Sequence, residues 1–367
     1  MSARATTLAQ GFSQKLLLEM YDKSLVEVIC NRDYQGEINN VGSVLNILAI
    51  ERVSEKTYTG ANLTPDSLYE KNAVLTIDQW KSFYWQEKTI DNWQSYIKEP
   101  HPKVVVQTAD ERNRNMDLYV LGKYGDVAAG NRIGTDYSTG DVSIDVAGVV
   151  TGNGTTFTAA MVGKGFKATG HTKWYRVKTF SSTTEIVIEN DEDDVTSLYD
   201  GGVIAGGTAY VIEAATVLTI TAANLLDKVA ALKLRLDKAE AEGKTSVPDQ
   251  DRVLLVPPEF ETILIKATGV ALHVPAVYEE LVKVGMITEL QGFKVFKTNR
   301  LSGNNTDGFH VLALHPNWQT FADTLLEAGI EEDLIGNFGT AYKDLFVYGS
   351  KVTDKRRHFA AEMFVKF

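Results

Sequence analysis

Residues 43–60 and 73–90 form two strand-like segments joined by a polar tip, and polar and apolar side chains alternate along the second segment. One face of that segment carries Leu75, Ile77, Lys81, Phe83 and Trp85, and the other carries Thr76, Asp78, Trp80, Ser82 and Tyr84. Because both faces carry aromatic groups, the hairpin requires apolar partners on both sides. It is either buried within one domain or laid on a neighbouring subunit, and the pattern favours neither.

Helical periodicity predicts a long helix over residues 103–128. Ala109, Met116, Tyr119 and Val120 lie at helical spacing. The charged run "DERNR" (110–114) falls on another face.

Helices alternate with strands in the last third of the chain, which predicts a mixed α/β domain. The predicted helices cover 222–243 (with Leu225, Val229, Leu232 and Leu236 on one face), a segment that opens at Pro258 and ends before Gly269, and 317–329 (with Trp318, Phe321, Leu325 and Ala328). The predicted strands cover 251–258, 309–316, 343–354 and 356–367, and a ribbon over 287–301 turns on Gly292.

Residues 134–220 are rich in Gly, Thr and Val, and short alternating strands recur between turn signals. This predicts a small all-β module, a sandwich or a barrel, inserted into the α/β chain. The glycine-rich runs 152–157 and 163–170 complete no phosphate-binding motif and open no helix, so we interpret both as turns.

A length of 367 residues with 44% hydrophobic and 23% charged residues indicates a water-soluble chain of two or three lobes. No apolar run approaches the roughly 20 residues that cross a bilayer, and the first residues lack the apolar core of a signal peptide. The single cysteine, Cys30, excludes an intrachain disulfide. Because the first residues lack the apolar core of a signal peptide, we expect the chain to be synthesised in the cytosol.

The formal charge of −11 disfavours sequence-specific DNA binding. The acidic run "NDEDD" (190–194) is more typical of a solvated tip than of a calcium site. His310 and His315 flank one strand on opposite faces, which argues against a shared metal ion. No catalytic, cofactor or metal site is predicted. The basic run "DKRRH" (354–358) is a solvated turn, an ion-pair node with a neighbouring subunit, or, less favoured in an acidic protein, a nucleic-acid contact.

Three stretches together resemble the major capsid proteins of tailed bacteriophages. They are "LTIDQWKSFYWQEKTIDNWQS" (75–95), "GMITELQGFKVFKTNRL" (285–301) and "HVLALHPNWQTFADTL…FGTAYKDLFVYGSKV" (310–352). Their order agrees with that family, and the resemblance covers nearly everything except about 140–220.

The resemblance implies an α+β tailed-phage capsid fold with an inserted small all-β domain. Its parts would be an N-terminal arm (1–43), an extended loop (44–95), a spine helix with peripheral domain (96–133), the inserted domain (134–220), an axial α/β domain with returning peripheral strands (221–350) and a C-terminal strand (351–367).

The resemblance also implies a virion shell of hexamers and pentamers around packaged double-stranded DNA, made in the host cytoplasm without a membrane. Scaffolding and portal proteins would be partners, and a decoration protein is an open option. Trp80, Phe83, Tyr84, Trp85, Phe293, Arg356 and Arg357 are the expected inter-subunit contacts.

Family members that crosslink join a lysine to an asparagine, but no residue pair here can be matched to them, so no crosslink is predicted. Two alternatives remain: an encapsulin-like compartment, and a surface or carbohydrate-binding protein that uses the β-module. We also expect deletion of residues 140–218 to leave assembly intact.

Overall fold

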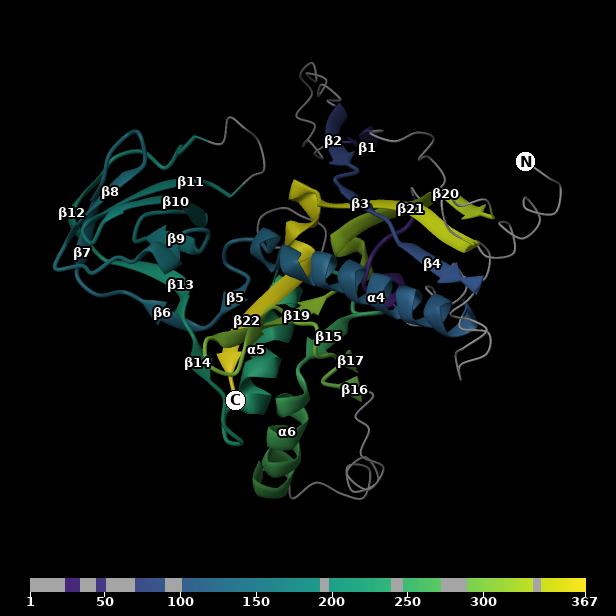
Figure 1. Ribbon diagram of the computed structural model, residues 1–367. Helices are drawn as coiled ribbons and strands as arrows, with labels where there is room; N and C mark the ends of the chain where they lie inside the picture. Colours follow the sequence, from purple (N-terminus) through teal and green to yellow (C-terminus); the bar gives the residue numbers. More distant parts are fainter. Residues whose placement is uncertain are drawn as a thin grey trace, which may run out of the picture. The chain divides into compact units, whose positions relative to one another are not determined.

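A computed structural model describes residues 24–33, 44–50, 70–89, 101–191, 198–238, 247–271, 289–332 and 338–367 (Figure 1). The chain forms two compact units. The first comprises Met1–Asn113 with Gln319–Lys351, and the second comprises Arg114–Trp318 with Val352–Phe367. No helix in these described ranges is long and apolar enough to cross a membrane.

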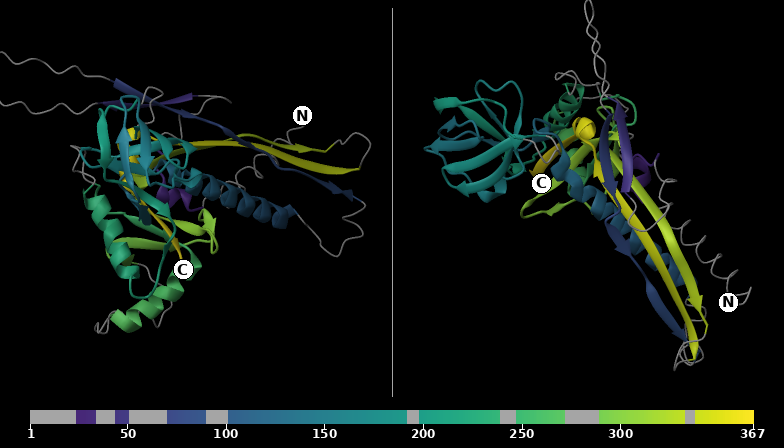
Figure 2. Two further views of the ribbon diagram at one scale, coloured as in Figure 1. Left: turned by 90° about the vertical axis from the view of Figure 1, so that its left-hand side faces the viewer. Right: turned by 90° about the horizontal axis from the view of Figure 1, so that it is seen from above.

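The first unit is built around the long strand β21 (Gly339–Val352). Strand β20 (Gln319–Glu331) is its neighbour on one side, and β3 (Gln79–Lys81) and β4 (Tyr84–Lys88) pair with it antiparallel on the other. Figure 2 shows β20 and β21 in yellow shades, running side by side. The sheet therefore joins two segments that lie far apart in the sequence.

The hairpin predicted at 43–90 is present in its first part and redirected in its second. β1 (Val44–Ile50) pairs antiparallel with β2 (Glu70–Thr76), whereas β3 and β4 pair with β21. The prediction of one continuous second strand is therefore wrong. The predicted contrast in burial is confirmed, because Leu75 and Ile77 are buried while Trp80 and Tyr84 are exposed. The single face predicted for Leu75, Ile77 and Lys81 is not confirmed, because the first two share a core with Val347 while Lys81 is exposed.

The helix predicted over 317–329 is wrong, because this segment is strand β20, preceded by the short 3₁₀ turn η5 (Pro316–Trp318). Every residue from Gln319 to Asp323 is buried, so the strand shows no alternation between polar and apolar faces. Pairing with β21 makes this segment a strand, although the local spacing of its apolar residues is helical. Asn31, which follows the short helix α2 (Val26–Ile29) of the predicted arm, forms a parallel bridge with Thr320.

The long helix predicted at 103–128 is α4 (His101–Leu121), followed by the 3₁₀ turn η2 (Gly122–Asp126). Among the side chains described for α4, the buried ones recur every three or four residues, singly or in adjacent pairs: Val105, Ala109, Arg112, Asn113, Met116, Asp117, Val120 and Leu121. The placement of residues 110–114 on another face is therefore wrong for Arg112 and Asn113, which are 2% and 0% exposed and lie among the buried positions.

The second unit contains a sheet in the order β14-β22-β19-β15-β17-β16, with β5 added beside β22 and β18 beside β19. The bounds are β5 Arg132–Ile133, β14 Leu218–Thr219, β15 Val253–Val256, β16 Glu289–Leu290, β17 Phe293–Lys297, β18 Gly303–Asn304, β19 Gly308–Leu314 and β22 Ala360–Lys366. The predicted final strand is thus shorter, since 354–359 form the 3₁₀ turn η6.

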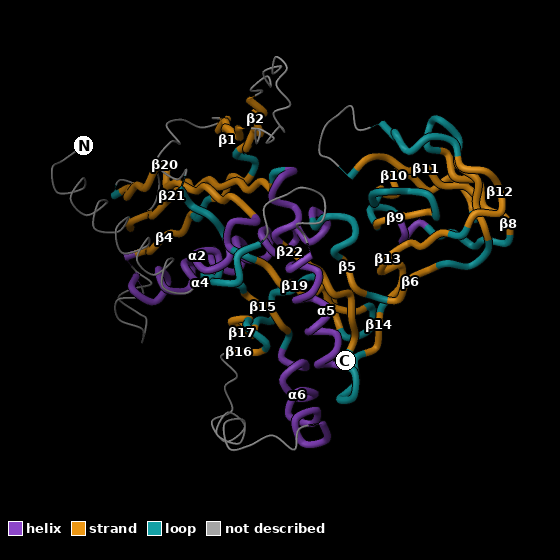
Figure 3. Tube along the Cα trace, turned by 180° about the vertical axis from the view of Figure 1, so that it is seen from behind, coloured by secondary structure: helices purple, strands orange, loops and turns teal. Residues whose placement is uncertain are grey.

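Helices α5 (Leu225–Asp237) and α6 (Pro258–Ala271) accompany this sheet (Figure 3). The apolar stripe predicted for α5 is confirmed, because Leu225, Val229, Leu232 and Leu236 are all buried. The ribbon turn at Gln291–Gly292 has φ of 50° and 87°, and a two-residue turn of this kind suits glycine at its second position. This confirms the predicted turn at Gly292.

Within the predicted β-rich segment, the described residues 135–191 and 198–216 form eight strands. They are β6 Thr135–Tyr137, β7 Asp141–Ile144, β8 Val149–Asn153, β9 Gly165–Ala168, β10 Tyr175–Ser182, β11 Glu185–Asn190, β12 Ile204–Thr208 and β13 Tyr210–Thr216. The order is β12-β7-β8-β11-β10-β9-β13-β6. Because β6 runs on into β7 and β12 into β13, and these two stretches pair antiparallel, the sheet closes on itself. We call residues 135–216 the β-module.

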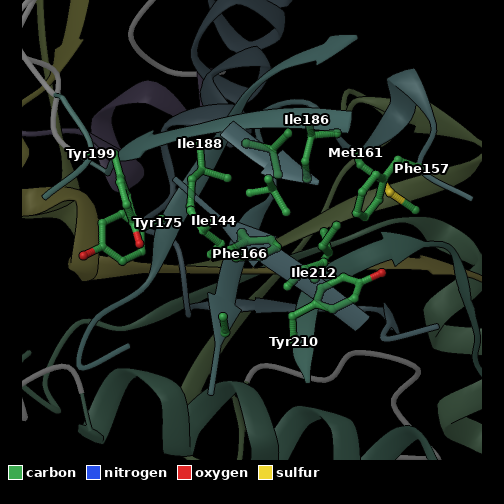
Figure 4. Close-up of a cluster of buried hydrophobic side chains, with 14 of the residues drawn as sticks. Ile144, Phe157, Met161, Phe166, Tyr175, Ile186, Ile188, Tyr199, Tyr210 and Ile212 are labelled. Carbon is green, nitrogen blue, oxygen red and sulfur yellow. The ribbon is translucent and has the colours of Figure 1, made fainter. Parts of the chain in front are cut away.

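The β-module has its own apolar core, formed by the inward-facing side chains of its strands (Figure 4). Phe166, Tyr210 and Ile212 lie in this core, so their odd-numbered neighbours face outward. Gly154 and Gly163 have φ of 70° and 80°, consistent with the turns predicted for the two glycine-rich runs.

Candidate subunit-contact surface

The sheet of the first unit exposes two aromatic side chains on one face. Trp80 is 53% exposed and Tyr84 is 63% exposed. They lie opposite Val347 and Lys343 of β21, and Lys343 forms an ion pair of 2.5 Å with Glu331. Large exposed aromatic groups on a soluble chain are typical of surfaces that contact another protein.

The other two aromatic residues predicted for this segment face the opposite way and contact their own chain. Trp85 is half-buried and stacks on Tyr342, with ring centroids 4.2 Å apart and 16° between the planes. Phe83 is half-buried and lies against the guanidinium of Arg112, 4.8 Å from the ring centroid. The structure thus divides the four aromatic residues into an outward pair, Trp80 and Tyr84, and an inward pair.

Arg112 of α4 forms a buried polar clamp on the inward face. Its Nη2 donates to both carboxylate oxygens of Asp344 at 2.8 Å. The rings of Phe83 and Phe346 each lie 4.8 Å from the guanidinium carbon. A charged side chain that is 2% exposed requires such a partner, because removing it from water is costly. In the sequence, this burial is indicated by the helical spacing of Arg112 from Val105, Ala109 and Met116.

Asp344 also explains why β3 and β4 are separate strands. The register is unbroken, since Trp80 pairs with Val347 and Tyr84 with Lys343. Between them the Phe83 N–H donates to the Asp344 carboxylate at 2.9 Å, while the Asp344 N–H still donates to the Phe83 carbonyl at 3.1 Å. The side chain has replaced one backbone acceptor of the ladder, which interrupts the strand without shifting it.

A third exposed aromatic residue was missed from the sequence. Phe338 is 86% exposed, and its carbonyl accepts the N–H of Thr89 at 3.1 Å, which places it beside the end of β4. It stands in the run "NFG", where neither strand nor helix periodicity draws attention to it.

The predicted contacts of the second unit are placed differently. Phe293 is 0% exposed and Arg357 is 3% exposed, whereas Arg356 is half-buried. Arg357 donates to the carbonyls of Asp126 and Asp191 at 3.1 and 2.8 Å. Because Phe293 and Arg357 are buried in their own chain, we remove these two from the candidate contacts and keep Arg356.

Asp191 of the acidic run joins the β-module to the rest of its unit. Its carboxylate pairs with Arg176 of β10 at 3.0 Å and with Arg357 at 2.9 Å, and accepts the N–H of Ala129 at 2.5 Å. The rest of the run, 192–194, lies outside the described residues. Among the described residues, no group of three or more His, Cys, Asp or Glu side chains is arranged to hold a metal ion.

A second buried cluster lies between the β-module and β22. Glu362 is 0% exposed, 2.6 Å from Nδ1 of His310 and 3.6 Å from Nε of Arg132. Burial raises the pKa of Glu362, but Arg132 and His310 outweigh it and hold the pKa below its usual range. Lys164 of the β-module lies 4.9 Å from the ring of Phe364 in the same cluster.

Glu213 of β13 is the other buried carboxyl group of this junction. Its oxygens accept the N–H groups of Gly130 and Arg132 at 2.7 and 3.4 Å. Burial raises the pKa of Glu213 to about 7, although Arg132 and Arg235 act in the opposite direction. The two carboxyl groups of the junction therefore respond to pH in opposite senses.

Glu213→Gln should flatten the pH dependence of stability between about pH 5 and 8. A pKa raised from 4.5 to about 7 on folding means that the folded chain binds more protons in this window, so its contribution is present at low pH and lost as pH rises. The loss is on the order of 3 kcal/mol. Urea unfolding of the unassembled chain at both pH values measures the free energy of unfolding. If this free energy changes with pH equally in the variant and the parent, the raised pKa assigned to Glu213 is contradicted.

Three solved structures share this fold over most of their length. A chain of mycobacterium phage Che8 aligns with a TM-score of 0.54 and 17% identity, covering 93% of this chain and 91% of that chain. The capsid structure of cyanophage P-SCSP1u aligns with a TM-score of 0.53 and 14% identity, covering 94% of this chain and 88% of that chain. The mature capsid of bacteriophage PhiM1 aligns with a TM-score of 0.52 and 12% identity, covering 94% of this chain and 87% of that chain. No family model and no curated protein matches the sequence. The chain therefore has the α+β fold that the resemblance implied.

Proposed function

We propose that this chain is a major capsid protein, a structural subunit without enzymatic activity that assembles into the icosahedral head shell of a tailed phage. The observation that carries the proposal is the shared fold with phage capsid chains over more than nine-tenths of this chain. The proposal includes the domain division given by the resemblance and a location in the virion. The solved structures that match come from phages, so these comparisons do not favour the cargo compartment or the surface-binding protein.

The proposed partners are other copies of the chain, in hexamers and pentamers. A scaffolding protein would act during assembly, a portal protein would occupy one vertex, and a decoration protein is a further option. Packaged double-stranded DNA would be enclosed without sequence-specific binding, in keeping with the formal charge of −11.

Trp80, Tyr84, Phe338 and Arg356 are the proposed inter-subunit contacts, with Phe83 and Trp85 supporting them from the inward face of the sheet. Burial of an aromatic side chain on a neighbour contributes on the order of 2 kcal/mol. A closed shell repeats each contact in every subunit, so modest contributions add up to a stable assembly.

Negative-stain electron microscopy of the purified chain, alone and with a co-expressed scaffolding protein, tests the proposal. Closed shells or six-fold rings are the expected result, and the density inside them distinguishes a phage head from a cargo compartment. A chain that stays monomeric under both conditions would contradict the shell function.

The double variant Trp80→Ala/Tyr84→Ala should reduce shell yield strongly while the unassembled chain stays folded. Both side chains are more than half exposed, so truncating them should change the free energy of unfolding by less than about 1 kcal/mol. Trp85→Ala is the matched control, because loss of its stacking on Tyr342 should destabilise the chain itself. Sedimentation gives the shell yield and urea unfolding gives the stability. Normal shell yield from the double variant would exclude this face as a contact.

A further inference from the structure

The outer surface of the β-module carries a cavity of about 390 Å³ that no part of the shell proposal uses. Lys167 of β9 and Val211 and Glu213 of β13 line it, each next in the chain to a residue of the core shown in Figure 4, Phe166 or Ile212. Trp174 and Arg235 of α5 complete the walls. The volume is within the range of small-molecule sites, which often lie where two structural elements meet.

The polar walls of the cavity are held in place by the backbone of Gly130. The Gly130 N–H donates to Glu213 at 2.7 Å, and its carbonyl accepts from Nη1 of Arg235 at 2.7 Å. The indole of Trp174 lies against the same glycine: a Cβ added there would be 2.6 Å from Cδ1 of the ring. Gly165 leaves the space that the Glu213 carboxylate occupies. Side chains fixed in this way lose little conformational freedom when a ligand binds.

Cationic groups and carboxyl groups line the cavity together. Lys167 and Arg235 are cations, and Asp136 and Glu213 are carboxyl groups. A phosphate would meet two carboxyl groups and a polyamine would meet two cations, so neither matches the lining. Carboxyl oxygens accept hydrogen bonds, and ammonium and guanidinium groups donate them. The indole offers a flat apolar surface, over which Lys167 Nζ lies 5.8 Å from the ring centroid.

We propose that this cavity binds a neutral pyranose sugar, with one apolar face of the sugar ring on Trp174 and its hydroxyl groups on Asp136, Lys167 and Arg235. Asp136 is pre-positioned for this role, since its Oδ1 already accepts the Ala214 N–H at 3.0 Å. Hydroxyl groups both donate and accept, which suits a lining that contains both kinds of partner. The inference does not depend on the shell function.

The test uses the full chain with ¹⁵N-labelled tryptophan, which gives one indole N–H signal from each of 5 tryptophans. Methyl glycosides of glucose, mannose and galactose are the probes. At least one should shift the Trp174 signal, assigned through Trp174→Phe, with a dissociation constant on the order of 1 mM. Asp136→Asn should weaken binding several-fold, whereas Trp80→Ala, in the other unit, should leave it unchanged.

Two results would overturn the proposal. One is the absence of any shift of the Trp174 signal with all three glycosides in a chain that unfolds cooperatively. The other is a shift of that signal with inorganic phosphate or spermidine in place of the glycosides, which would assign the cavity to an anion or a cation. Since Asp136→Asn changes an exposed side chain, it keeps the test valid if Trp174→Phe fails to fold.

Discussion

Asp344→Ala should lower the free energy of unfolding of the unassembled chain by about 3–5 kcal/mol. The substitution removes the carboxylate that neutralises Arg112, whose guanidinium is 2% exposed between Phe83 and Phe346. It also removes the acceptor of the Phe83 N–H. Urea unfolding followed by fluorescence measures the change.

Three control variants separate the contributions. Asp344→Asn keeps an oxygen for the Phe83 N–H but not the charge, so its loss should be smaller. The double variant Arg112→Met/Asp344→Leu replaces the ion pair by apolar groups and should recover much of the stability. Glu331→Ala breaks the exposed pair with Lys343 and should cost less than about 1 kcal/mol. A loss for Asp344→Ala as small as that of Glu331→Ala would show that the clamp is not a major source of stability.

Deletion of residues 140–218 should abolish cooperative folding of the second unit, contrary to the expectation drawn from the sequence. The deletion removes Asp191, which pairs with Arg357, and Glu213, which accepts the N–H groups of Gly130 and Arg132. Arg357 is 3% exposed and would lose the carboxylate beside it. We therefore expect the β-module to act as a structural partner of β22 that cannot be removed without loss of folding.

Thermal unfolding and limited proteolysis of the unassembled deletion variant measure this effect. Asp191→Ala alone should reproduce part of it, with a loss of about 3 kcal/mol. Lys178→Ala, which breaks an exposed pair with Glu189 in the same β-module, should change stability little. A deletion variant that melts cooperatively and assembles into shells would restore the original expectation.

The sequence predicts this fold well where one side of an element is buried and the other is solvated. The alternation that separates Leu75 and Ile77 from Trp80 and Tyr84 has this origin, and so does the stripe of α5. Strand β20 lacks such a contrast because Gln319 to Asp323 are buried on both faces. Its apolar spacing therefore matched a helix by coincidence.

The candidate surface was predictable in its residues but not in their directions. Alternation along residues 80–85 separates Trp80 and Tyr84 from Phe83 and Trp85, but which pair faces outward depends on β21, which lies more than 250 residues further along the chain. Arg112 was expected on the charged face of the helix, because charged side chains are usually exposed to solvent. Its partner Asp344 is supplied by the same distant strand, and no local pattern encodes that pairing.

The position of β22 sets the order of events during synthesis. This strand lies inside its sheet, with β19 on one side and β14 and β5 on the other, although residues 360–366 are made after all of them. Residues 360–366 must therefore emerge from the ribosome before the sheet of the second unit can be completed. A nascent chain that stalls earlier displays unpaired strands to chaperones and proteases, and it presents no finished surface to its neighbours.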